Sequence, residues 1–153
     1  MYRYLVLCVG LAACVSAGGE FASPDAGLTG RYSRQVVVSD HPHHVLYGHM
    51  ARLTDGETEV LALVISHRRD GVHRLRFSQA LLPSGRPLPF RRLDPRLGCS
   101  HGHCRNDAIG FIALTEAMVA EAGRAGFRAL LVGPSGSIPL AVPPAPFAAV
   151  AQH

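Results

Sequence analysis

Cysteine and histidine gather in one short segment of this chain, residues 98–107, which reads GCSHGHCRND. Cys99 and Cys104 are separated by four residues, and His101 and His103 lie between them. Thiols and imidazoles at this spacing are compatible with a disulfide, a transition-metal site or a reactive thiol. The segment alone permits all three chemistries, so the choice depends on the compartment that the protein occupies.

The N-terminus has the composition of an export signal. Arg3 supplies a positive charge, and residues 5–13, LVLCVGLAA, form an apolar run that ends in small residues. Even when it is extended to Ala17, the apolar stretch has thirteen residues, fewer than the roughly 20 that a transmembrane helix needs. The sequence therefore predicts an exported protein without a permanent transmembrane anchor.

Two cleavage sites compete within this signal. Leu11-Ala12-Ala13-Cys14 resembles the lipobox of bacterial lipoproteins, which implies a signal peptide of residues 1–13, acylation of Cys14 and a periplasmic domain tethered to a membrane. Valine, not aspartate, follows the cysteine, and by resemblance to enterobacterial lipoprotein sorting this favours the outer membrane. Val15-Ser16-Ala17 instead fits a signal peptide of residues 1–17 and a secreted or soluble periplasmic protein. We favour the lipobox, because cysteine is uncommon in a mature exported chain unless it is paired or used.

Export makes a disulfide the leading interpretation of the cysteine segment. Cleavage removes Cys8, and Cys14 is either acylated or removed, so only Cys99 and Cys104 remain. An isolated pair of cysteines in an oxidising compartment is expected to form a disulfide. Closing so small a loop stabilises the folded chain by about 2 kcal/mol in the chain-entropy model.

A copper or zinc site is the first alternative. His101 and His103 point the same way if the segment is extended, so two imidazoles remain available when the cysteines are oxidised. Further ligands are expected from the segment DHPHH, where the candidates are His41, His43 and His44. In this alternative the protein is a periplasmic metal binder, whereas the leading interpretation requires no cofactor.

A thiol-dependent enzyme is the second alternative. The four-residue gap is longer than the two residues of thioredoxin-like sites, and a disulfide would remove Cys104 as a nucleophile. The chain contains neither H-E-x-x-H nor G-x-x-x-x-G-K. The sequence therefore favours a non-catalytic protein and assigns no catalytic residue.

Basic residues cluster in the middle of the chain. All 15 basic residues are arginine, and the window from Arg68 to Arg105 carries a net charge of +7, against −3 for the remainder. Guanidinium groups bind phosphate and carboxylate groups bidentately. For an exported protein the expected partners are envelope components, namely lipid headgroups, anionic polysaccharide or another envelope protein, and not nucleic acid. The candidate anion-binding residues are Arg68, Arg69, Arg74, Arg76, Arg91 and Arg92. Alternatively, these arginines line the wet face and edges of a sheet, where charge discourages aggregation.

Short extended runs separated by turn signals predict a mainly β fold, either an antiparallel meander or a β-sandwich-like domain. Runs at residues 32–39, 45–53, 59–68, 72–82 and 87–93 are followed by others at 108–114, 127–133 and 137–142. Asp55-Gly56, Asp70-Gly71 and the Pro83-Ser84-Gly85 bend predict hairpins between successive runs. In residues 72–82, alternation places Leu75, Phe77 and Leu81 on one face. An α+β sheet backed by a helix is the alternative.

One short helix is predicted between the β runs. Thr115 is a suitable N-cap for residues 116–125, Gly126 a suitable stop, and Met118, Ala122 and Ala125 would form a thin apolar stripe. We expect a flexible tether over residues 14–30 and a single mainly β domain over residues 31–153. The last residues are expected to pack Phe147 and Val150 against this domain.

Overall fold

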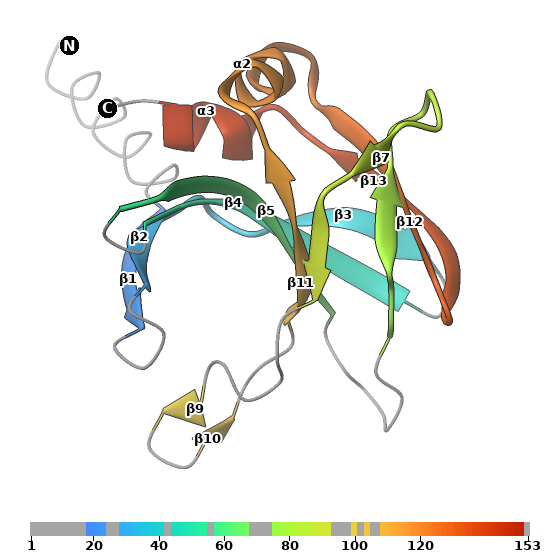
Figure 1. The fold of residues 1–153 in the computed structure, drawn as a ribbon, viewed down its shortest axis with the longest axis horizontal. Helices are drawn as coiled ribbons and strands as arrows, with labels where there is room; N and C mark the ends of the chain where they lie inside the picture. The colour runs from blue at the N-terminus through green and yellow to red at the C-terminus, as the bar shows by residue number, and fades with distance from the viewer. Residues whose placement is uncertain are drawn as a thin grey trace, which may run out of the picture.

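The computed structural model describes residues 18–23, 28–41, 44–54, 57–67, 75–92, 99–100, 103–104 and 108–151. In these residues, two antiparallel sheets and two short helices surround one hydrophobic core (Figure 1). This architecture confirms the predicted mainly β class, with one helix more than the sequence indicates.

The larger sheet has seven strands in the order β1-β2-β4-β5-β11-β8, and β3 pairs with β4 beside this path. The strands are β1 (Gly19–Ser23), β2 (Leu28–Tyr32), β3 (Val36–His41), β4 (His44–Thr54), β5 (Glu59–His67), β8 (Phe90–Arg92) and β11 (Ala108–Leu114). Their order breaks the predicted meander, because β11 lies between β5 and β8 although both precede it in sequence.

The smaller sheet has four strands in the order β13-β12-β6-β7. These strands are β6 (Gln79–Leu81), β7 (Pro87–Leu88), β12 (Phe127–Gly133) and β13 (Gly136–Val142). A separate two-stranded hairpin consists of β9 (Cys99–Ser100) and β10 (His103–Cys104).

Helix α2 (Glu116–Ala125) has the limits that the sequence predicts. The Thr115 hydroxyl accepts a hydrogen bond from the Met118 N–H, and Gly126 ends the helix with a φ of 78°, a region that favours glycine. Val119 and Ala122 form its buried side. The prediction that Ala125 belongs to the apolar stripe is wrong, because that residue is exposed.

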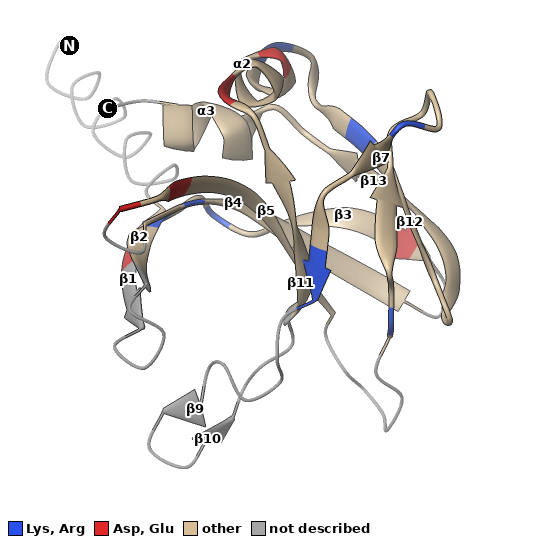
Figure 2. Cartoon of the chain, viewed as in Figure 1, with Lys and Arg blue, Asp and Glu red and all other residues tan. Residues whose placement is uncertain are grey.

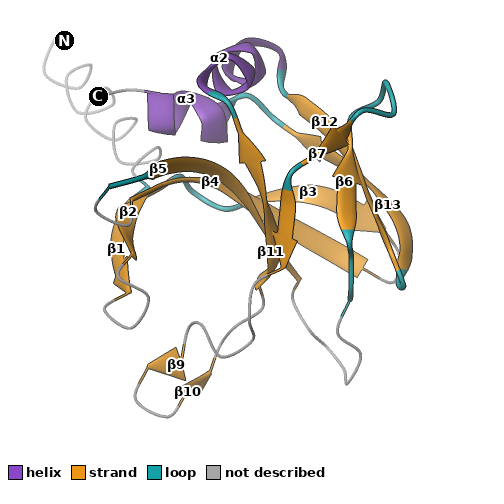
Figure 3. Ribbon diagram, viewed as in Figure 1, coloured by secondary structure: helices purple, strands orange, loops and turns teal. Residues whose placement is uncertain are grey.

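Helix α3 (Ala145–Ala151) was not predicted as a helix, although its apolar residues pack as expected. Phe147 is fully buried and Val150 is nearly so. The helix lies against β2 and β4, and α2 packs on α3, so both helices cover the larger sheet on one side (Figure 3). Phe127 contacts Phe147 with ring centroids 6.0 Å apart, which joins the smaller sheet to this layer.

Strand β4 has two successive partners along one of its edges. Residues 44–48 pair with β3, and residues 51–54 pair with β2. At the step between them, Ser33 is buried; its N–H donates to the Met50 carbonyl, and its hydroxyl accepts from the Met50 N–H. The sequence predicts a tether up to residue 30, but β1 and β2 are part of the sheet, so the described residues of that range are not a linker.

Strands β3 and β4 approach each other closely at Gly48. A Cβ atom at this position would lie 2.7 Å from Cγ1 of Val38 and 3.5 Å from Cδ1 of Leu63. Val38 and Leu63 are both buried. The absence of a side chain at residue 48 therefore allows Val38 to enter the core.

The segment predicted as one strand at residues 87–93 serves both sheets. β7 pairs with β6 in the smaller sheet, and two residues later β8 pairs with β11 in the larger sheet. Pro89 lies between them, and its carbonyl accepts a hydrogen bond from the Ala113 N–H. A short segment thus links the two sheets directly.

One of the predicted hairpins forms, and another does not. The Pro83-Ser84-Gly85 bend does connect a hairpin, since β6 pairs with β7 and Gly85 has a φ of 83°. Asp70-Gly71 lies outside the described residues, and the strands on either side of it, β5 and β6, lie in different sheets and so do not pair as a hairpin. Alternation within residues 75–81 also shifts: Leu75, Phe77 and Ala80 are buried, whereas Leu81 is only half-buried.

Candidate functional site

The two cysteines of residues 98–107 are opposite each other in the β9–β10 hairpin. The register pairs Cys99 with Cys104 and Ser100 with His103. Directly opposed residues in an antiparallel pair have Cα atoms about 4.5–5.5 Å apart, within the range that disulfides span. The disulfide stays a prediction, and this backbone register is compatible with it.

Ser100 is a potential nucleophile that is not among the candidates above. Residues 98–102, GCSHG, match the pattern G-x-S-x-G. In α/β-hydrolases that pattern forms a sharp turn between a strand and a helix, which exposes the serine. Here Ser100 belongs to a two-residue strand paired antiparallel with β10, so the context that the pattern needs is not found.

Two of the histidine candidates lie together at the end of the larger sheet. His41 ends β3, His44 begins β4, and the register pairs these residues directly. Their rings are stacked, with centroids 6.0 Å apart and an interplanar angle of 17°. His43 and His101 lie outside the described residues, and only the backbone of His103 is described.

A third histidine, missed by the sequence analysis, joins this pair. His67 ends β5, and its ring centroid lies 5.8 Å from that of His44 at an angle of 65°. The register pairs His67 with Leu46, which is two residues from His44 and so on the same face of the sheet. Only the pairing of β4 with β5 identifies His67 as a neighbour of His44, and the local sequence does not specify that pairing.

The cysteine hairpin connects to the same end of the sheet. β8 ends at Arg92, opposite Gly110, and β11 begins at Ala108, opposite Ser66. The chain therefore leaves and re-enters the sheet beside the end at which the three histidines lie. In the part of the chain that the structure describes, no three His, Cys, Asp or Glu side chains are arranged to hold a metal ion.

Three of the six candidate anion-binding arginines are described, and all three are exposed. Arg91 and Arg92 belong to β8, the terminal strand of the larger sheet. In Figure 2 the strand beside β11 carries a blue segment, the colour of basic residues. Arg76 precedes β6, and its backbone is held against the β12–β13 turn. The backbone N–H of Arg76 donates a hydrogen bond to the Ser135 hydroxyl at 2.8 Å. Arg68, Arg69 and Arg74 lie outside the described residues.

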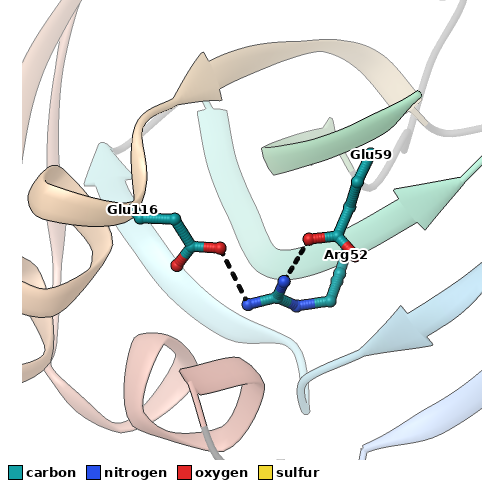
Figure 4. A network of polar contacts seen from close by, with 3 residues as sticks. All are labelled: Arg52, Glu59 and Glu116. Atoms are coloured by element: carbon teal, nitrogen blue, oxygen red, sulfur yellow. Dashed lines mark hydrogen bonds and ion pairs between the residues drawn. The ribbon is translucent and has the colours of Figure 1, made fainter.

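Arg52 in β4 has a different role. Its side chain is 16 % exposed and forms ion pairs with Glu59 of β5 and, at 3.2 Å, with Glu116 of α2 (Figure 4). These contacts join the sheet to the first turn of the helix, where a carboxylate also interacts favourably with the helix dipole. We interpret this cluster as structural, since the guanidinium is already neutralised by two carboxylates.

The opposite face of β4 carries another half-buried histidine. His49 contacts Tyr32 edge to face, with ring centroids 5.9 Å apart. Burial lowers the pKa of His49 below its ordinary value, because desolvation disfavours the imidazolium. This side chain lies apart from the three histidines at the sheet end, since residues 44 and 49 differ by an odd number of positions along the strand.

Residues of β3, β12 and β13 line a groove of about 640 Å³. Asp40 and Arg128 contribute its charged groups, and Val37, Leu130 and Pro139 are among its apolar ones. The groove contains neither the cysteine hairpin nor the described arginines of the basic window.

Comparison with known proteins yields no match: no protein family, no curated protein and no solved structure is significantly similar to this chain. Among the described residues, no helix has the length and apolar character required to cross a membrane.

Proposed function

We propose that this chain is an exported bacterial envelope protein with a non-catalytic interaction role, tethered to the outer membrane through an acylated Cys14. Its folded domain contacts anionic envelope components through arginines at the edge of the larger sheet. The export signal and the resemblance of residues 11–14 to a lipobox support the location, and the arrangement of charges supports the interaction.

The main support for anion binding is a contrast between arginines that form ion pairs within the fold and arginines that do not. Arg52 and Arg31 are paired within the fold, Arg52 with two carboxylates and Arg31 with Glu20 at 3.6 Å. Arg91 and Arg92 are exposed, and within the described part of the chain no ion pair involves them. Arg91 and Arg92 are consecutive on an edge strand, so their side chains point to opposite faces of the sheet, and each guanidinium is available to phosphate or carboxylate groups.

Vesicle binding tests this proposal. The double variant Arg91→Gln/Arg92→Gln is compared with Arg124→Gln/Arg128→Gln, a matched control that removes the same charge from exposed positions on α2 and β12. Each basic residue near an anionic membrane contributes about 1 kcal/mol, so the first variant should bind anionic phosphatidylglycerol vesicles about 30-fold more weakly. Binding by the parent should also weaken between 0.1 and 1 M salt, because the screening length falls from about 10 to 3 Å.

Equal weakening by both double variants would indicate a non-specific effect of net charge and would contradict the assignment to β8. Binding to purified anionic envelope polysaccharide, measured with the same four substitutions, separates a polysaccharide partner from a lipid headgroup.

The intact mass of protein purified from its native envelope tests the location. A chain that begins at residue 14 and carries acyl groups would establish the lipoprotein. A chain that begins at residue 18 would contradict the tether and indicate a secreted or soluble periplasmic protein.

A further inference from the structure

We propose that the outer face of the larger sheet, the face turned away from the helices, binds an anionic phospholipid, with its acyl chains along the sheet and its phosphate at Arg91. The inference rests on the proposed function, because it takes a lipid as the anionic partner. It deepens that function by assigning the surface that holds the lipid. In Figure 1 the strands β1, β2, β4 and β5 arch around this face, so it is the concave side of the sheet.

Strand register sets a row of side chains across the outer face. Arg91 of β8 is opposite Phe111 of β11, and Phe111 is opposite Val64 of β5. Val64 is in turn opposite His49 of β4, whose ring contacts Tyr32 of β2. Directly opposed residues share a face of the sheet, and neighbouring strands lie about 4.8 Å apart, so the row from β8 to β4 is about 14 Å long. One leaflet of a bilayer has a hydrocarbon layer of about 15 Å, so the row has the length of an acyl chain.

The middle of the row is apolar but does not belong to the hydrophobic core. Val64 and Phe111 are half-buried, whereas their neighbours Leu63 and Ile112 are fully buried in the core on the other face. Both helices lie on that core side, with α3 against β2 and β4 (Figure 3). The outer face therefore keeps apolar side chains that neither helix covers.

The charge of the outer face is concentrated at one end of the row. Arg91 is exposed, and none of the ion pairs in the described part of the chain involves it. Burial lowers the pKa of His49, so its imidazole is neutral at pH 7 and adds no charge to the row. Asp40, a carboxylate on the same face, is opposite Val45 and lies on β3, four strands from β8. A cation at one end of an apolar row is complementary to a phosphate at one end of an acyl chain.

Titration calorimetry on the full exported chain tests the proposal, with dihexanoyl phosphatidylglycerol below its micelle concentration as the probe. The deacylated headgroup, glycerophosphoglycerol, should bind at least about 100-fold more weakly, because each buried CH₂ group contributes about fourfold in affinity. Arg91→Gln should weaken binding of the acylated probe about fivefold. Arg92→Gln is the matched control and should bind as the parent does, since this side chain points to the other face.

A second pair of variants tests the apolar part of the surface. Val60 and Val64 are half-buried and four residues apart on β5, so they share the outer face. Val60→Thr/Val64→Thr keeps the side-chain shape but removes two methyl groups, and it should weaken binding of the acylated probe about 15-fold. Leu130→Thr/Val132→Thr, which changes two half-buried residues of β12 in the smaller sheet, should leave this binding unchanged. Circular dichroism checks that each variant is folded.

Equal weakening by Arg91→Gln and Arg92→Gln would overturn the proposal, as would unchanged binding in Val60→Thr/Val64→Thr. The comparison of the two arginine variants decides the matter even if the valine variant does not fold. Parent protein that binds phosphatidylglycerol vesicles through both arginines but does not bind the dihexanoyl probe would refute the lipid site and leave the proposed function standing. Parent protein that binds neither would refute both.

Discussion

Replacement of Gly48 by alanine tests whether the close approach of β3 and β4 is a packing requirement of the core. The new Cβ atom would lie 2.7 Å from Cγ1 and 3.6 Å from Cγ2 of Val38. Rotation of Val38 offers little relief, because β-branched side chains are restricted at χ1. Overpacking should therefore exceed the modest gain from replacing glycine in a strand, and Gly48→Ala should lower the free energy of unfolding by about 1–2 kcal/mol.

A second substitution separates this steric cause from any other effect of the new methyl group. Val38 is 2 % exposed, so Val38→Ala alone should cost about 1.5–3 kcal/mol through lost burial and a cavity. In the double variant the clash is absent and the alanine at residue 48 fills part of the space. Its total cost should be about 1–2.5 kcal/mol, instead of the roughly 2.5–5 kcal/mol expected for independent sites.

Urea unfolding of the four proteins, followed by circular dichroism, provides the double-mutant cycle. We expect a coupling free energy of at least about 1 kcal/mol in favour of the double variant. Costs that add to within about 0.5 kcal/mol would refute the packing argument, because they would show that residues 38 and 48 do not compete for the same space.

Four further predictions concern the cap, a helix glycine, a half-buried imidazole and the disulfide. Thr115→Ala removes the acceptor of the first-turn N–H and should lower the free energy of unfolding by about 1 kcal/mol in urea, whereas Thr115→Ser should restore it. Gly123→Ala should raise that free energy by about 0.5–1 kcal/mol, since its methyl group would meet atoms no closer than 3.8 Å; a destabilised variant would contradict this packing. Because the folded-state pKa of His49 is lowered, the unfolded chain binds more protons below about pH 6.5, and stability should fall as the pH drops through that value toward the folded pKa. The urea midpoint should therefore fall more between pH 7.5 and 5.5 in the parent than in His49→Gln, and equal changes would contradict the role of His49. Cys99→Ser/Cys104→Ser should lower stability by about 2 kcal/mol under oxidising conditions and by nothing relative to the reduced parent, so an equal difference under both conditions would argue against a disulfide.

Features that depend on neighbouring residues could be predicted well from sequence. Helix α2 begins and ends where Thr115 and Gly126 indicate, because capping is a contact within one turn of helix. The extended run predicted at residues 59–68 likewise forms β5, which ends one residue earlier. Each of these features is determined by residues that are close in the chain.

Features that depend on distant partners could not be predicted. The Asp70-Gly71 signal indicates a change of direction, but nothing in it says that β5 pairs next with β11 and not with β6. The same limit applies to the cluster of three histidines at the end of the larger sheet. His41 and His44 share one hairpin and could be proposed together, whereas His67 reaches them only through the register of β4 with β5.

The position of β11 has a consequence for the newly made chain. A polypeptide synthesised from its N-terminus completes β5 more than forty residues before β11, the strand that pairs along its second edge, begins at Ala108. During that interval an apolar strand has an unpaired edge, which is a template for association with other chains. We therefore expect truncated chains that end before residue 108 to aggregate, and the complete chain to benefit from a chaperone that shields β5 until β11 has emerged.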